Sequence, residues 1–218
     1  MDTLRFAVLG STRGSSLQPL LDALVDPAHP LGLFGRNISI VAVLSNLEKA
    51  PILARARISP ACKTSTIKWI GTQKGVSREE YDKRTTTILE NLPQGPPDMI
   101  LCIGYMRILS KFFCTRWEWK TFNIHPSLLP KHSGLMDLAV HQSVIDAGDK
   151  ISGCSVHYVT HEVDEGLVVR RTQVSVDPEY DTAEAVKAKV QPTEARALAE
   201  TLLAFQENEI GPREIVDL

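Results

Sequence analysis

"LRFAVLGSTRGSSLQPLLDAL", residues 4–24, is the stretch that decides the fold class. Its first seven letters are apolar apart from Arg5 and predict a buried strand, and "SSLQPLLDAL" (Ser15–Leu24) predicts a helix. The turn between them, "STRGS", is rich in Gly and Ser. A strand followed at once by a helix is typical of α/β folds, in which helices cover a mostly parallel sheet.

The alternation continues along the chain. Further apolar strands are expected at 38–45, 98–104 and 121–125, and helices at 50–56, 77–92, 107–119 and 138–148. The strands are apolar on both faces, which favours a parallel sheet covered on both sides. The pattern then changes, because "GCSVHYV" and "LVVRRTQVSV" are separated only by "THEVDEG", a spacing that favours an antiparallel hairpin. A last helix is expected from Thr182 to Gln206, kinked or split at Pro192.

The sequence therefore predicts an α/β fold with an open, mostly parallel twisted sheet, helices on both faces and an antiparallel C-terminal hairpin. We expect residues 1–218 to form a single domain, because no linker or repeat interrupts them and the tail "GPREIVDL" is too short to fold alone.

Composition narrows the class of protein. Hydrophobic residues make up 43% and charged residues 23%, which is ordinary for a globular chain, and no apolar stretch is long enough to predict a membrane span. The net charge of -2 gives no reason to expect nucleic acid as a partner. Four scattered cysteines, Cys62, Cys102, Cys114 and Cys154, lack metal-ligand spacing. With no signal peptide expected, a cytoplasmic monomer or homodimer fits these observations.

"TFNIHPSLLP" (Thr121–Pro130) carries the first candidate chemistry. Residues i and i+2 of a strand share a face, so Asn123 and His125 emerge side by side, and Pro126 ends the strand. A donor amide next to an imidazole is typical of a reaction centre. The alternative is a core histidine whose hydrogen bonds are satisfied.

Two further stretches suggest ligand sites. Gly14, Ser15 and Ser16 present backbone N–H groups at a helix N-terminus, where anions bind, or form a simple tight turn. Neither the dinucleotide fingerprint nor the P-loop pattern is present there. In "IGYMRIL", Met106, Ile108 and Leu109 either line a slot for a flat ring or form the inner face of the next helix.

Asp164 lies in the turn "THEVDEG" with Gly166 close behind. Turns favour Asp for structural reasons. If this turn folds back over His125, however, the carboxylate favours the imidazolium and orients the ring.

"NIHPSLLP", together with "GYMRIL" upstream and "SGCSVHYVTHEVDEG" downstream, closely resembles the folate-dependent formyltransferases. The resemblance extends from the first strand to "AKVQPTEARAL". It implies a Rossmann-like fold, no metal, and formyl transfer from 10-formyltetrahydrofolate to the primary amine of glycinamide ribonucleotide in purine biosynthesis.

The resemblance also implies roles for individual residues. The catalytic residues of the family are matched by Asn123, His125 and Asp164. The loop that binds the substrate phosphate is matched by Gly14, Ser15 and Ser16, and the amine side of the substrate site by Glu194. The folate site is matched by Arg78, Met106, Arg107, Ile108, Leu109 and Asn123. Residues 1–104 would then form the phosphate-binding half, and residues 105–218 the folate-binding and catalytic half.

Three departures from the family pattern lie on the amine side: Ser16 ends the phosphate loop, the segment near 135–141 is longer than usual, and Pro192 stands next to Glu194. They leave open a formyltransferase of the same scaffold acting on another amine, such as an amino-sugar nucleotide. We do not expect a transfer-RNA formyltransferase, because the sequence shows neither a second, RNA-binding domain nor a surplus of basic residues. We do not expect a formyl-folate hydrolase either, because no N-terminal regulatory domain is apparent. A non-catalytic nucleotide-binding module leaves "NIHPSLLP" unexplained, and a nicotinamide dehydrogenase lacks its glycine fingerprint.

Overall fold

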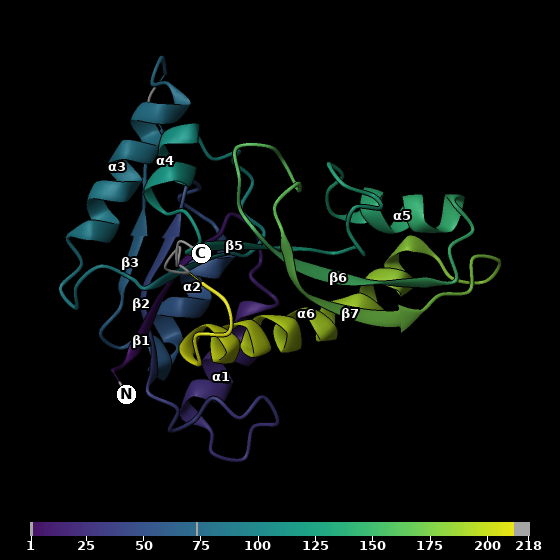
Figure 1. Cartoon of the computed structure of the whole chain (residues 1–218), viewed down its shortest axis with the longest axis horizontal. Coiled ribbons are helices and arrows are strands. Elements are labelled where there is room, and N and C mark those ends of the chain that lie inside the picture. The colour runs from purple at the N-terminus through teal and green to yellow at the C-terminus, as the bar shows by residue number, and fades with distance from the viewer. Residues whose placement is uncertain (1, 73, 212–218) are drawn as a thin grey trace, which may run out of the picture.

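Seven strands form one sheet in the order β3-β2-β1-β4-β5-β6-β7 (Figure 1). The computed structural model describes residues 2–72 and 74–211, so the tail 212–218 of the predicted single domain lies outside the described residues. The strands are β1 (Leu4–Leu9), β2 (Ile38–Ser45), β3 (Thr66–Trp69), β4 (Met99–Cys102), β5 (Thr121–His125), β6 (Ile151–Tyr158) and β7 (Val168–Ser175). Strands β1 to β5 pair in parallel, whereas β6 runs antiparallel to both β5 and β7. The predicted parallel sheet with an antiparallel hairpin is confirmed.

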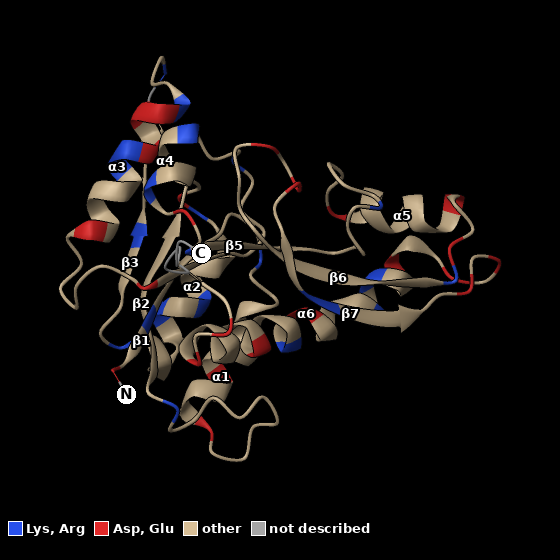
Figure 2. Ribbon diagram, in the orientation of Figure 1, with Lys and Arg blue, Asp and Glu red and all other residues tan. Residues whose placement is uncertain are grey.

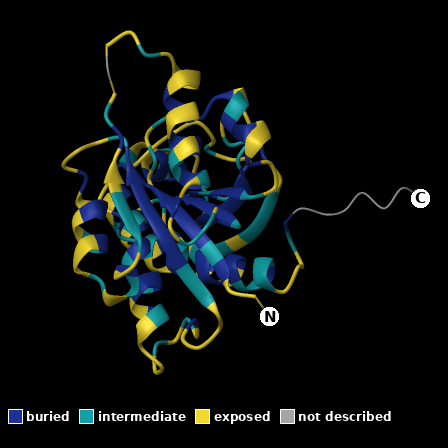
Figure 3. Ribbon diagram, turned by 90° about the vertical axis from the view of Figure 1, so that its left-hand side faces the viewer, coloured by how far each residue is buried: buried dark blue, intermediate teal, exposed yellow. Residues whose placement is uncertain are grey.

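Helices cover both faces of the sheet, as predicted. They are α1 (Leu17–Val25), α2 (Pro51–Ile58), α3 (Arg78–Glu90), α4 (Lys111–Arg116), α5 (Leu138–Asp146) and α6 (Ala183–Gln206), with a short 3-10 helix, η1, at Pro60–Cys62. One core joins the sheet to α1, α2, α5 and α6, and a second core joins it to α3 and α4. Figure 3 shows the result, with buried strands inside and exposed positions on the outer helices and loops.

The central strand explains why the sheet is covered on both sides. Phe6 and Val8 of β1 point into the first core, while Ala7 and Leu9 point into the second, and all four are buried. A strand buried on both faces must be apolar at every position, because neither face reaches water. The run "FAVL" of residues 6–9 has this property. Arg5, just before it, pairs with Asp98 at the amino end of the strand.

Three details of the predicted elements were wrong. The edge strand β3 was not predicted, because polar and apolar residues alternate along its four positions and form no apolar run. All four residues are half-buried or exposed. Helix α4 covers only Lys111–Arg116, because residues from Gly104 onward turn along the sheet edge before the helix begins at its Ser110 N-cap. Pro192 does not split the last helix, which is continuous from Ala183 to Gln206, while the alternative of a kink stays a prediction.

Charges of both signs are interspersed over the ribbon, for example along α3 (Figure 2). That helix begins with a capping box in which Ser77 and Glu80 satisfy each other's backbone N–H groups. Among the described helices, none is both long and apolar enough to cross a membrane.

The register of the parallel strands positions the functional edge. Leu9 of β1 lies opposite Cys102 of β4, and Cys102 lies opposite Asn123 of β5. The carboxyl ends of these three strands therefore reach the same edge of the sheet, which is where open α/β sheets bind ligands.

Candidate active site

A cavity of about 910 Å³ opens at the carboxyl edge of β1, β4 and β5. Its walls come from the β1–α1 turn, the stretch after β4, the end of β5, the β6–β7 connection and the middle of α6. Segments far apart in the sequence therefore contribute to one site. The volume is within the range of small-molecule pockets.

The β1–α1 turn brings Gly14, Ser15 and Ser16 to the cavity wall, as predicted. Gly14 has φ +63°, and a Cβ at this position would lie 2.5 Å from Ile52 Cγ1, so only glycine fits. Ser16, the residue before α1, donates its hydroxyl to Glu194 Oε2 of α6 instead of capping its own helix. The first turn of α1 therefore has no side-chain cap, although the N–H of Leu17 donates to the Gly14 carbonyl at 3.0 Å.

Strand β5 places Asn123 and His125 on one face, and both line the cavity. Asn123 lies directly opposite His157 of β6, and its Nδ2 is 3.1 Å from His157 Nε2. His125 is 4% exposed. The strand period thus produced the predicted side-by-side pair.

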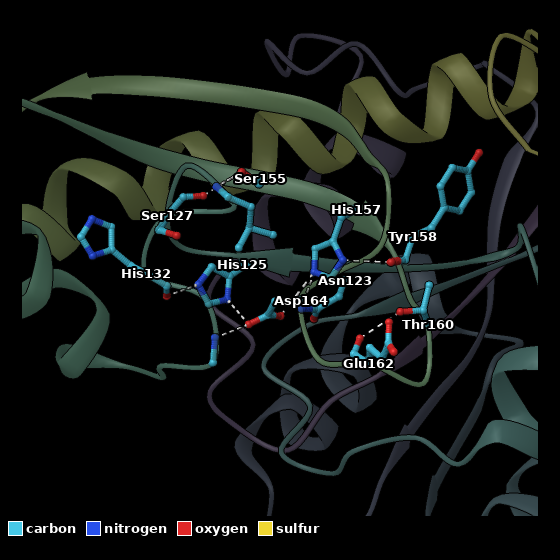
Figure 4. A network of polar contacts seen from close by, with 12 residues as sticks. Asn123, His125, Ser127, His132, Ser155, His157, Tyr158, Thr160, Glu162 and Asp164 are labelled. Carbon is cyan, nitrogen blue, oxygen red and sulfur yellow. Dashed lines mark hydrogen bonds and ion pairs between the residues drawn. The ribbon is translucent and has the colours of Figure 1, made fainter.

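Asp164, in the connection between β6 and β7, folds back over His125 (Figure 4). Its Oδ2 lies 3.2 Å from His125 Nδ1, and its Oδ1 lies 3.5 Å from His157 Nε2. The residue has φ +58°, a left-handed conformation that Asp tolerates better than most residues, and the backbone N–H of Gly134 donates to Oδ2 at 2.9 Å. The carboxylate is therefore held in place by backbone conformation and by hydrogen bonds from two sides.

The second nitrogen of His125 also has an acceptor. Its Nε2 lies 3.1 Å from the backbone oxygen of His132. A carbonyl and an ionised carboxylate only accept hydrogen bonds, so the ring satisfies both when each nitrogen carries a proton.

Burial and charge act in opposite directions on this pair. Burial lowers the pKa of His125, while Asp164 and the His132 carbonyl raise it, and the net direction is downward. For Asp164, burial raises the pKa, but hydrogen bonds from His157 and from Gly134 N–H, with the His125 charge, lower it below its usual value. The site therefore holds an anionic carboxylate against a buried imidazole, and the carboxylate opposes the loss of the ring's charge that burial favours.

The chain is similar to known proteins over most of its length. The model of the family described as "Formyl transferase" matches residues 4–202. The chain belongs to the formyl transferase family. It is 34% identical over 191 residues to the phosphoribosylglycinamide formyltransferase of Escherichia coli, covering 88% of this chain and 82% of that protein. It is also 39% identical over 177 residues to the trifunctional purine biosynthetic protein adenosine-3 of Drosophila melanogaster, covering 81% of this chain but only 12% of that relative's length.

A solved formyl transferase has the same architecture. The phosphoribosylglycinamide formyltransferase of Coxiella burnetii, in complex with CHES, aligns with a TM-score of 0.83 and 30% identity over 98% of this chain and 92% of that chain. The predicted Rossmann-like formyltransferase fold is confirmed.

In this formyl transferase the stretch after β4 lines the cavity wall. Met106 and Ile108 are 47% and 49% exposed, whereas Leu109 is buried in the core beneath α4. Met106 N–H is held by Ser11 Oγ at 2.9 Å. The Arg107 guanidinium stacks over the Tyr81 ring, 3.9 Å from its centroid, and so forms part of the wall rather than reaching freely into solvent. The expectation that these residues form the inner face of the next helix is wrong, because α4 begins only at Lys111, and the slot for a flat ring stays a prediction.

Arg78, in contrast, is not among the residues that line the cavity. It is the exposed first residue of α3. The structure thus brings together every predicted site residue except this one, whose role in folate binding stays a prediction.

Glu194 lines the cavity beside Ser16, close to a group of residues that sequence reasoning did not identify. Burial raises the pKa of Glu194, with the Ser16 hydrogen bond and the nearby Lys187 opposing it. Lys187 forms an ion pair with Asp137, which belongs to the longer segment near 135–141. His141 lines the same region, and burial and Lys187 lower its pKa to about 4, so its ring is neutral near pH 7.

Two histidines of the site were also missed. His157 of β6 lies across from Asn123 of β5. The alternation of residues along "GCSVHYV" would place His157 on the cavity face, but only once the pairing of β5 with β6 is known. His132 acts through its backbone oxygen, which no sequence pattern indicates.

Proposed function

We propose that this chain transfers the formyl group of 10-formyltetrahydrofolate to the primary amine of glycinamide ribonucleotide. The observation that carries the proposal is the convergence of Asn123, His125 and Asp164 at one edge of one cavity. The names of the relatives support the choice of substrates. Since the chain spans only 12% of the insect relative's length, the proposal concerns this one reaction.

The reaction begins when the amine nitrogen attacks the formyl carbon. A tetrahedral intermediate forms, and its oxygen takes up negative charge. Asn123 is positioned to donate an N–H of its amide to this oxygen, a contact whose removal typically costs about 2.7–4 kcal/mol. Protonated His125, directly beside it on β5, stabilises the same charge.

Proton transfer completes the reaction. The bond between the formyl carbon and N10 of the folate breaks, N10 takes up a proton, and the attacking nitrogen loses one. Protonated His125 supplies the proton to N10, directly or through water, and Asp164 orients the ring and favours its charged form. Asp164 accepts the proton that the attacking amine releases, directly or through water, and this proton replaces the one that His125 gives to N10.

The residues that line different parts of the cavity suggest where each substrate binds. The phosphate of the acceptor binds at Gly14, Ser15 and Ser16, where the helix N-terminus favours an anion. Glu194 contacts the amine side, and the folate ring lies along Met106, Arg107, Ile108 and Leu109. On this proposal residues 1–104 hold the phosphate, and residues 105–218 hold the folate and perform the chemistry in the cytoplasm.

One assay tests the function. Purified protein is mixed with 10-formyltetrahydrofolate and glycinamide ribonucleotide, tetrahydrofolate is followed by absorbance, and the formylated product by mass spectrometry. We expect turnover with this acceptor and none with an amino-sugar nucleotide. Turnover with the amino-sugar nucleotide alone would instead assign the chain to the rival reaction of the same scaffold.

Matched variants locate the chemistry. Asn123→Ala and His125→Ala are expected to reduce kcat by about 10²–10⁴-fold, because each removes a group that acts on the transition state. His161→Ala serves as the control, since its side chain is 57% exposed and outside the cavity wall. Near-wild-type turnover by either of the first two variants contradicts the mechanism.

A further inference from the structure

The backbone of residues 131–134 contacts both members of the His125–Asp164 pair. The carbonyl of His132 accepts from His125 Nε2 at 3.1 Å, and the N–H of Gly134 donates to Asp164 Oδ2 at 2.9 Å. That carboxylate oxygen is the one facing His125 Nδ1. One short segment therefore sets where the ring and the carboxylate meet.

The side chain of His132 holds this segment against α5, away from the cavity. Its Nδ1 lies 2.7 Å from Ser143 Oγ, and its Nε2 lies 3.1 Å from Asp149 Oδ2. Its side chain is only 12% exposed and is absent from the residues lining the cavity. Asp149 receives a further ion pair from Lys131 at 2.7 Å.

The conformation of His132 is one that such a clamp helps to hold. Its φ is +59°, in the left-handed region that few residues other than glycine adopt. Fixing both ring nitrogens opposes relaxation of this backbone, which would withdraw the carbonyl from His125. Figure 4 shows the His132 ring pointing away from the His125–Asp164 contact, while its backbone oxygen faces His125.

We propose that the His132 side chain, clamped by Ser143 and Asp149, is a positioning element that holds the His125–Asp164 pair in its reactive geometry without touching either substrate. This role in catalysis rests on the proposed formyl transfer. The groups that act on His125 are Asp164 and the carbonyl of His132, which raise its pKa, and His157 and the His132 ring, which lower it; His141 also interacts with it. Loss of the carbonyl removes an acceptor that favours the charged ring, while the burial that opposes the charge remains.

Four variants test the clamp. His132→Gly accepts the left-handed backbone and keeps the carbonyl but loses the side chain. Asp149→Ala removes the acceptor at His132 Nε2, whereas Asp149→Asn keeps an oxygen there and is the rescue variant. Lys131→Ala is the control, because Lys131 Nζ is on an exposed side chain that contacts Asp149 and not His132.

We expect kcat to fall about tenfold or more in His132→Gly and Asp149→Ala with KM changed less than about twofold, because small displacements of catalytic groups act on the chemical step. Asp149→Asn should recover part of this loss, and Lys131→Ala should match the wild type. Thermal unfolding of each variant separates a loss of rate from a loss of folded protein.

A measurement without substrate keeps this inference separate from the proposed function. In NMR titrations of labelled histidines, the His125 ring of Asp149→Ala, which keeps the His132 side chain, should lose its proton at lower pH than in the wild type. Unchanged titration together with kcat within about twofold of the wild type overturns the proposal. If the wild type formylates neither acceptor, the proposed function fails, and the titration still decides whether the clamp sets the state of His125.

Discussion

Asp164 is the residue on which the protonation of the site depends. It is the only carboxylate within ion-pair distance of His125 among the described residues, and it opposes the lowering of that pKa by burial. Asp164→Asn keeps the size of the side chain and tolerates the positive φ, but it removes the charge. The His125 pKa should therefore fall further. Because the charged ring is the active form, activity is complete below that pKa and is lost as pH rises through it.

We therefore expect kcat of Asp164→Asn to be reduced about 10²–10⁴-fold near neutral pH, with the alkaline limb of its pH profile displaced to lower pH. Glu165→Gln removes a charge from the exposed neighbour and should leave the profile unchanged. An alkaline limb at the wild-type position in Asp164→Asn contradicts the assigned role.

Asn123 and His125 were predictable at this scale because the strand period alone aligns them. His132 was not, since its contribution comes from a backbone oxygen.

The β6–β7 connection is the element that carries Asp164 to the sheet edge. Gly166 anchors it, because a Cβ at this position would lie 1.7 Å from the backbone oxygen of Tyr158. Gly166→Ala must push the connection away from β6 and carry Asp164 with it. Since a displacement of about 1 Å can cost about 10²-fold in rate, we expect a comparable fall in kcat, measured alongside thermal unfolding. Gly32→Ala is the control: φ there is +63° with open space around the added Cβ, so it should lose some stability and keep its kcat. Equal kcat in both variants argues against this coupling.

Elements show where sequence reasoning succeeds and where it fails. The strands at 38–45 and 121–125 were predicted to the residue, because the first is hydrophobic apart from its two serines and Pro126 ends the second. Strand β3 was missed because a four-residue edge strand buries too little to leave a pattern. Pro192 was expected to kink or split α6, yet the helix remains continuous, since packing against β6, β7 and α5 outweighs the loss of one backbone hydrogen bond.

At the scale of the whole molecule, the cavity joins the β1–α1 turn to α6 and to the β6–β7 connection, so ligand binding should stabilise the entire fold. Arg13 lines the cavity at the phosphate turn, and its guanidinium makes no hydrogen bond or ion pair with the described residues. Its backbone oxygen is fixed by Arg55 Nε at 2.6 Å. The hydrogen bond from Lys187 and, to a lesser extent, the charge of Arg13 lower the pKa of Asp137, and a guanidinium with no hydrogen bond of its own is suited to bind a phosphate.

We therefore expect glycinamide ribonucleotide alone to raise the melting temperature of the wild type. At a ligand concentration of about 100 times Kd, binding adds about 2.7 kcal/mol, and for a chain of this size each kcal/mol corresponds to about 2–4 °C. Arg13→Gln should unfold at the wild-type temperature without ligand, since its side chain bonds to nothing in the described chain, and should show a smaller shift with ligand. Inorganic phosphate at the same concentration provides the comparison for a purely ionic effect. If the variant keeps the full shift, the phosphate is bound elsewhere, and the amine end of the acceptor must then be placed anew relative to Asn123 and His125.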